Sequence, residues 1–240
     1  MVTFDPVKRA ALGFFAGVRA LFGGLWFIVS TPSAWGLALV PVLVAGLLFA
    51  GAAALAIWGA DQLSDLLVLR IVFWAIGLVV AFVLAISLAQ PLSGFALDAI
   101  ARKQELALGG RVWPSQPTLT SAVRSLRVSL TALALGLPVL ALLALVTFLF
   151  PPAAVVTLPL KFLVTGVLAA YDLLDYPLSQ RGRSVADRLV FIRSNFPAVL
   201  GFGAATAAVL LVPGVGLLLL PFGVAGATRM VMEAERLDRP

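Results

Sequence analysis

Four long runs without a charged residue dominate this chain of 240 residues and limit what it can fold into. They are residues 34–60, 71–97, 128–160 and 196–228, which hold 27, 27, 33 and 33 residues. A helix of 27 residues is about 40 Å long, more than the ~30 Å hydrocarbon core of a bilayer. The runs therefore predict helices that lie in a membrane.

The composition agrees with this prediction and excludes most catalytic chemistry. Hydrophobic residues make up 62% of the chain and charged residues 12%, against roughly 45–50% and about 25% in soluble proteins. Cys and His are both absent, which excludes thiol catalysis, disulfides, imidazole acid–base chemistry and the usual zinc or haem ligands. No P-loop occurs either. We expect no enzyme, no metal and no cofactor.

The first two runs predict two long transmembrane helices that form an antiparallel pair. Residues 34–60 and 71–97 are each long enough to cross the bilayer once, and residues 61–70 connect them. Trp35 and Trp58 lie near the two ends of the first predicted crossing. Trp74 lies near the start of the second, so all three rings are expected at the headgroup layers.

The other two runs predict helical hairpins. A run of 33 residues would be about 50 Å long as one helix, and each run is interrupted, by Pro151 and Pro152 or by Pro213 and Gly214. We therefore expect hairpins over residues 128–171 and 196–228. Because neither interruption carries a charge, we favour hemi-penetrating hairpins with their tips buried against protein. Hairpins that cross the bilayer fully and return are the alternative.

The distribution of cations predicts the orientation. Residues 98–127, 172–195 and 229–240 hold five, four and three Lys or Arg residues, whereas residues 61–70 hold one. The positive-inside rule places the first three segments in the cytoplasm, with both termini. The other cations assigned to that side are Lys8, Arg9 and Arg19. Residues 1–33 are expected to form an interfacial amphipathic helix of this single membrane domain.

The net charge of +6 suits lipid headgroups or small anions. Nucleic acid is not an expected partner, because the Arg residues stand in short stretches between apolar runs. Lys161 is the only charge within the apolar limbs of either predicted hairpin. An anion could pair with it, since an ionisable group at membrane depth is costly to bury. Its long stem could equally carry the amine to the headgroups.

A polar cluster follows the first predicted hairpin. Asp172 and Asp175 stand three residues apart, so they share a face of a helix, and the only two tyrosines, Tyr171 and Tyr176, accompany them. One interpretation is a cation or proton site near the membrane boundary. The favoured interpretation is structural: the acids pair with nearby arginines while Pro177 ends the helix. These arginines, which could also attract an oxyanion, are Arg181, Arg183 and Arg188.

The sequence Gly201-Phe202-Gly203 is superficially similar to a dinucleotide-binding loop. It lies inside an uncharged membrane run and follows no predicted strand, so it lacks the structural context of such a loop. Small residues that allow two helices to approach closely are the favoured interpretation.

Residues 171–178, with Arg181-Gly182-Arg183-Ser184, resemble the tyrosine–aspartate–tyrosine–proline motif of CysZ-type sulfate permeases, a family related to the etoposide-induced membrane proteins. Residues 201–203 and 213–216 follow in the family's order. The resemblance implies an inner-membrane protein with two long crossing helices and two hemi-penetrating hairpins. It also implies sulfate uptake for cysteine biosynthesis and a homo-oligomer.

One position departs from the family. Members that bind sulfate carry a Gly-Leu-Arg-Arg-like turn before the first crossing helix, and this chain has Pro32-Ser33-Ala34-Trp35-Gly36 there. The hydroxyls of Thr31 and Ser33, with the amides of the helix start, are the remaining candidates for anion binding at this turn. We expect a small-anion permease for sulfate. The alternative is a non-transporting membrane organiser that binds lipid or partner proteins.

Overall fold

The computed structural model describes residues 11–63, 66–114, 118–212 and 215–237. Within these ranges every regular element is helical, which confirms the predicted all-α class. Lys8, Arg9, Pro213 and Gly214 lie outside the described residues. The elements are α1 (Phe14–Ser30), α2 (Pro32–Leu63), α3 (Leu67–Leu92), α4 (Gly94–Ala107), α5 (Thr118–Leu149), a 3₁₀ turn (Pro151–Ala153), α6 (Ala154–Gln180), α7 (Val185–Ser194), α8 (Phe196–Leu210) and α9 (Gly216–Leu237).

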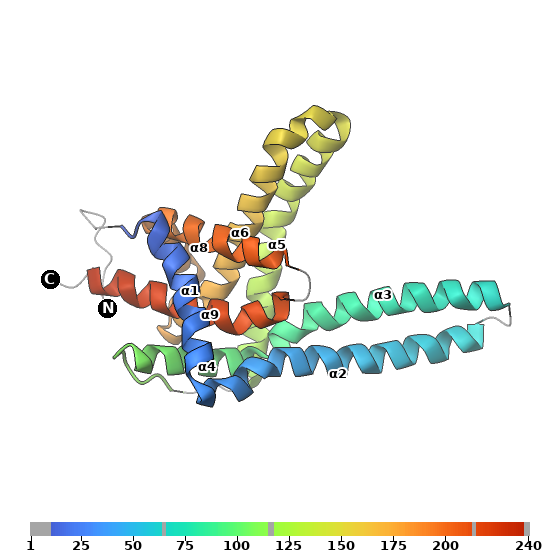
Figure 1. Cartoon of the computed structure of the whole chain (residues 1–240), viewed down its shortest axis with the longest axis horizontal. Coiled ribbons are helices and arrows are strands. Elements are labelled where there is room, and N and C mark those ends of the chain that lie inside the picture. Colours follow the sequence, from blue (N-terminus) through green and yellow to red (C-terminus); the bar gives the residue numbers. More distant parts are fainter. Residues whose placement is uncertain (1–10, 64–65, 115–117, 213–214, 238–240) are drawn as a thin grey trace.

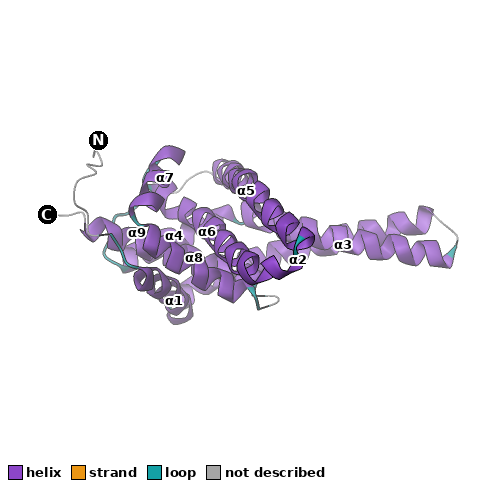
Figure 2. Ribbon diagram, turned by 90° about the horizontal axis from the view of Figure 1, so that it is seen from above, coloured by secondary structure: helices purple, strands orange, loops and turns teal. Residues whose placement is uncertain are grey.

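Two helical arms extend from a packed base (Figure 1). Helices α2 and α3 lie side by side and antiparallel as the first arm (Figures 1 and 2). Helix α5 and the first part of α6 form the second arm, which points in a different direction. The base contains α1, α4, α8, α9 and the last part of α6. We call these parts the α2–α3 arm, the α5–α6 arm and the base.

Five described helices are long and apolar enough to cross a membrane: α2, α3, the part of α5 from Leu126 onward, α6 with the turn before it, and α9. In the most apolar stretch of α2, α3 and α5 only 11% of the residues are buried within the protein. Leu47 on α2 is 75% exposed. A surface of this kind is stable in lipid and unstable in water.

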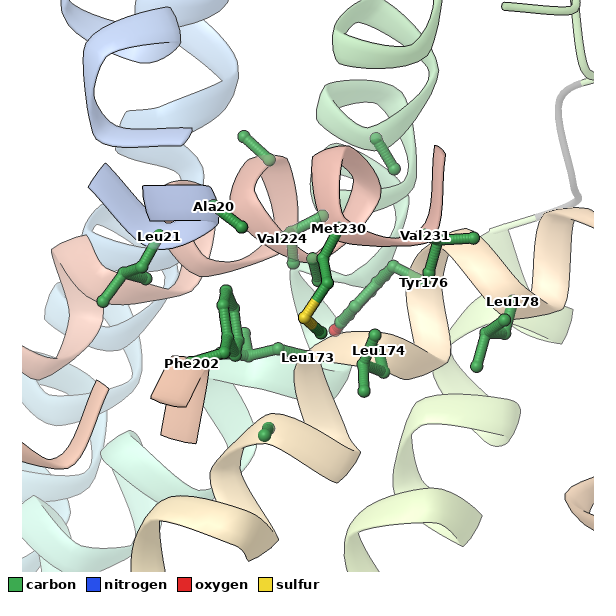
Figure 3. Packing of buried hydrophobic residues seen from close by; sticks show 14 of the residues in the cluster. Ala20, Leu21, Leu173, Leu174, Tyr176, Leu178, Phe202, Val224, Met230 and Val231 are labelled. Carbon is green, nitrogen blue, oxygen red and sulfur yellow. The ribbon is translucent and has the colours of Figure 1, made fainter. Parts of the chain in front are cut away.

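The core of the chain lies in the base, where α1, α4, α6, α8 and α9 meet. Phe202, Val224, Met230 and Tyr176 are at most 1% exposed and point toward one another (Figure 3). Their side chains come from three helices, so this core exists only when the helices have assembled.

Glycines bring the base helices unusually close. A Cβ atom on Gly203 would lie 2.5 Å from the carbonyl oxygen of Gly166, and the reverse substitution would meet Gly203 at the same distance. A Cβ atom on Gly17 of α1 would lie closer still, 1.8 Å from the carbonyl oxygen of Ala198 on α8. The interpretation of Gly201-Phe202-Gly203 as a helix-packing segment is therefore confirmed.

One expectation is wrong for the hairpin over residues 128–171. We expected its tip to be buried against protein, but Pro151 and Pro152 are exposed. The reason is that α5 and α6 contact mainly each other beyond the base, so no other helix covers the end of their arm. The corresponding residues of the other hairpin, Pro213 and Gly214, lie outside the described residues.

Candidate functional site

The tyrosine–aspartate cluster lies in the last part of α6, inside the base. Asp175 and Tyr176 are each 1% exposed, and Tyr171 is buried as well. The expectation that Pro177 ends the helix is wrong, since α6 continues to Gln180. Proline removes one backbone N–H and one helical bond, and the packing of this segment on α4, α8 and α9 compensates for that loss.

The end of α6 is set by Gly182, two residues after Gln180, the last residue of the helix. Gly182 has a φ of 65°, a left-handed conformation that other residues adopt at a cost. Its N–H donates to Ser179 O at 2.9 Å, and Arg183 N donates to Leu178 O at 3.1 Å. This pair of bonds is a Schellman-type helix end, and it directs the chain into α7.

Asp175 forms a buried ion pair with Arg188 of α7. Their closest atoms, Oδ1 and Nη1, are 2.5 Å apart. Ser179 Oγ donates to Asp175 Oδ1 at 2.8 Å and accepts from Arg188 Nη2 at 2.9 Å. Because both charged side chains are at most 7% exposed, each one compensates the other's loss of hydration. This is the structural pairing that the sequence suggested for Asp175.

Asp172 has a different partner. Its Oδ2 accepts a hydrogen bond from Nε2 of Gln90, near the end of α3. The two acids therefore connect α6 to different elements, Asp172 to α3 and Asp175 to α7.

Arg181 is held by two carboxylates that the sequence analysis did not single out. It lies 2.9 Å from Glu105 of α4 and 2.6 Å from Glu235 of α9, and its guanidinium stacks 5.6 Å from the ring centre of Trp113. Burial lowers the pKa of Arg181, but the hydrogen bonds and charges of Glu235 and Glu105 outweigh it, so the pKa is raised above its usual value. Arg181 is thus fully charged and already neutralised by neighbours.

A basic side chain reaches the turn between α1 and α2. Lys103 Nζ of α4 donates to Ser33 Oγ at 3.1 Å, and this contact is exposed. Thr31 precedes α2, and its carbonyl accepts from the N–H of Ala34 at 2.9 Å. The turn that lacks arginines in the sequence therefore acquires a cation from another helix.

Helix α4 lies between this turn and the ion pair of Arg181 with Glu105. Lys103 and Glu105 are two residues apart, so they point in opposite directions from the helix axis, one toward Ser33 and the other toward Arg181. The sequence signal for Glu105 is its seven-residue spacing from Asp98, which places both on the buried face of α4. No comparable signal marks Lys103, because its contact depends on where α2 begins.

The remaining candidates lie apart from one another. Arg183 is half-buried in the turn between α6 and α7. Lys161 is in the α5–α6 arm, where its only described hydrogen bond is to Thr147. The structure brings together Asp175 and Arg188, but it does not gather all the predicted anion ligands in one site.

Apolar arms on a base that contains buried ion pairs define a multi-pass helical membrane protein. The chain matches the model of the family described as "Sulfate transporter CysZ/Etoposide-induced protein 2.4" over residues 20–221. It belongs to that family.

Three similar proteins carry the first of the two names in this family description. Those named "Sulfate transporter CysZ" from Pseudomonas paraeruginosa (strain DSM 24068 / PA7) and Pseudomonas aeruginosa (strain LESB58) are each 32% identical over 169 residues, or 68% of this chain. A third, from Pseudomonas fluorescens, is 35% identical over 80 residues, which are 33% of this chain and 32% of its own. The match spans 64% of the length of the first two relatives. The family predicted from the sequence motif is therefore confirmed.

Proposed function

We propose that the protein is an inner-membrane small-anion permease that carries sulfate into the cell for cysteine biosynthesis. The observation that carries this proposal is membership of the CysZ family over residues 20–221. The relatives named as sulfate transporters support the choice of anion, and the excess of cations, 17 against 11 acids, is compatible with it.

The turn between α1 and α2 is the proposed anion contact. Thr31 and Ser33 supply hydroxyls, and Lys103 supplies a cation within 3.1 Å of Ser33. Because this contact is exposed, a dissolved anion can reach the amine. Arg181 and Arg188 have carboxylate partners, so we assign them the role of holding α4, α6, α7 and α9 together. That assignment makes them supports of the site rather than ligands.

The proposed topology has two full crossings. α2 and α3, of 32 and 26 residues, exceed the ~30 Å of hydrocarbon. The α5–α6 arm points in a different direction from the α2–α3 arm (Figure 1), so it enters the bilayer obliquely and reaches less depth, as a hemi-penetrating hairpin does. We propose the same for residues 196–228, with the base and both termini on the cytoplasmic side.

Two exposed surfaces support further parts of this proposal. On α1, Phe15, Phe22 and Trp26 are 76%, 54% and 71% exposed, which fits a helix in the headgroup layer. At the end of the α5–α6 arm, Phe148 is 82% exposed. An uncovered apolar tip of this kind is compatible with assembly into a homo-oligomer as well as with contact to lipid.

Flux of labelled sulfate into liposomes that contain the full chain tests the proposal. We expect uptake above that of empty liposomes, and roughly tenfold slower uptake at subsaturating sulfate for Lys103→Gln because it loses a charged hydrogen bond to the anion. Arg70→Gln is the matched control, since Arg70 pairs with Asp61 at the far end of the α2–α3 arm. Uptake equal to that of empty liposomes would exclude transport and leave the membrane organiser as the function.

A further inference from the structure

The α5–α6 arm contains a small polar group within an apolar surface. Lys161 Nζ on α6 donates to Thr147 Oγ1 on α5 at 2.9 Å. Thr147 Oγ1 and Thr157 Oγ1 are 2.7 Å apart, within hydrogen-bond distance of each other. Thr157 is 4% exposed. We call Thr147, Thr157 and Lys161 the arm-tip cluster.

The amine of this cluster points toward the end of the arm. Lys161 stands seven residues after the start of α6, and side chains on a helix point toward its N-terminus. The N-terminus of α6 is the arm's tip (Figure 1). The tip itself is apolar, with Phe148 and Val155 at 82% and 81% exposed. The cluster thus places a cation close to a surface that otherwise favours lipid.

The charge of Lys161 has no counter-charge within the described part of the chain. No carboxylate described there lies within ion-pair distance of its amine, and Thr147 is its one hydrogen-bond acceptor. An ammonium group has three N–H donors, so two of them are unused. A cation with unused donors near hydrocarbon is costly unless an anion approaches it.

The two hydroxyls can turn toward such an anion. Thr147 Oγ1 lies 2.7 Å from Leu143 O, and Thr157 Oγ1 lies 3.0 Å from Ala153 O. These carbonyls belong to helical or turn backbone and accept backbone N–H bonds. A threonine hydroxyl that leaves such a carbonyl therefore leaves no buried acceptor unpaired.

We propose that the arm-tip cluster binds an oxyanion group, a phosphate or sulfate, through the Lys161 ammonium and the Thr147 and Thr157 hydroxyls. The group comes either from an anionic phospholipid or from a dissolved anion, because both present the same tetrahedral oxygens. Two helices contribute donors to one position, and charged hydrogen bonds to oxyanions are the stronger kind. This site is distinct from the turn between α1 and α2, and it does not depend on transport.

The test uses the full chain in nanodiscs of phosphatidylcholine, with and without phosphatidylglycerol. Native mass spectrometry measures retained phosphatidylglycerol, and labelled sulfate measures binding in nanodiscs of phosphatidylcholine alone. We expect Lys161→Gln to weaken one of the two by roughly tenfold and Thr147→Val to weaken the same one by a few-fold. Lys161→Arg should retain most of the binding, since it keeps the charge.

Thr131→Val is the matched control. Thr131 also lies on α5 and donates to the carbonyl four residues earlier, Arg127 O at 2.9 Å, but it belongs to no such cluster. Loss of phosphatidylglycerol alone identifies a lipid site, and loss of sulfate alone identifies a solute site. Thr147→Val provides the comparison if Lys161→Gln does not fold.

The proposal is overturned if Lys161→Gln or Thr147→Val, once folded, retains both ligands as Thr131→Val does. Its failure is distinguishable from failure of the transport proposal. Wild-type liposomes without sulfate flux, combined with lysine-dependent binding of phosphatidylglycerol, would exclude transport and support the arm-tip site. Sulfate flux that depends on Lys103 without any effect of Lys161 or Thr147 on binding would do the reverse.

Discussion

In a soluble protein the most apolar helices are the most buried, and the α2–α3 arm and the base of this protein show the opposite relation. The stretches of α2 and α3 have a higher mean hydropathy than that of α9, yet 11% of their residues are buried within the protein, against 67% for α9. In lipid, apolar side chains gain nothing by leaving the solvent. Helices therefore associate where their backbones can approach or where polar groups bond, and the base offers both.

Most glycines show the same difference between the two regions, and Gly77 of α3 is an exception, because an added Cβ would lie 2.6 Å from the Cβ of Ala56 on α2. In the base, Gly166 and Gly203 bring the backbones of α6 and α8 into contact, whereas Gly46 and Gly51 of α2 have nothing within 4 Å of the position of an added Cβ. The presence of glycine on a membrane helix is thus not enough to identify a contact. The partner must lie opposite it.

Loss of an ion pair in the base should change the free energy of unfolding more than any other substitution compared between the two regions. Arg188→Met removes the cation that lies 2.5 Å from the buried carboxylate of Asp175, and we expect a loss of about 3–5 kcal/mol in the free energy of unfolding. The intrinsic tryptophan fluorescence of the detergent-solubilised chain during denaturation measures it. Combining Arg188→Met with Asp175→Asn should recover part of the loss. If the single variant unfolds like the wild type, the pair does not stabilise the base.

Charge introduced at the centre of the α2–α3 arm should have the next largest effect. Leu47→Arg places a cation midway along α2, where membrane insertion costs about 2.5–3.5 kcal/mol more. Leu106→Arg on α4 is the control, because Leu106 is also exposed, at 49%, but belongs to the base. The inserted fraction in a translocation assay is the measurement. Equal insertion of the two variants would contradict the placement of α2 in the bilayer.

Substitution of a glycine at a helix contact should have the third largest effect. Gly203→Ala forces α6 and α8 apart, and we expect it to destabilise the chain by about 1–3 kcal/mol. Gly46→Ala should be neutral or should stabilise by up to about 1 kcal/mol, because alanine favours the helix and meets no neighbour there. Thermal unfolding of both variants in the same detergent compares them. Matching melting temperatures would show that the close approach contributes nothing.

The smallest effect should come from the ion pair on the α2–α3 arm. Asp61 and Arg70 are 3.5 Å apart with side chains 42% and 31% exposed, so Asp61→Asn should change the free energy of unfolding by less than about 1 kcal/mol. The same denaturation experiment as for Arg188→Met detects the change. An effect as large as that of Arg188→Met would mean that another protein group or a second copy buries this end.

Much of the fold could be predicted from the sequence because charge and run length act locally. The uncharged run 71–97 predicts a crossing, and α3 occupies most of it. The exact end could not be predicted: Pro91 lies inside α3, and the break comes two residues later at Ser93. Packing in the base decides where a helix stops when a proline alone does not.

The sequence singled out Asp172 and Asp175, but it did not identify the partner of each one. Nothing in the spacing of Asp172 and Asp175 distinguishes their neighbours, yet one contacts Gln90 and the other Arg188. Gln90 is 82 residues away from Asp172 in the chain. Contacts over such separations depend on how helices are placed, which local spacing does not encode.

The amino-acid sequence by itself determined the membrane class, the all-helical fold and the CysZ family, because hydropathy, charge and a contiguous motif are properties of neighbouring residues. Only the tertiary structure decided which charges are neutralised and which are available. Arg181 and Arg188 are paired in the base, while Lys103 reaches Ser33 and Lys161 reaches Thr147. The physical reason is that the state of a charge depends on the groups within a few ångströms of it, and helix packing chooses those groups.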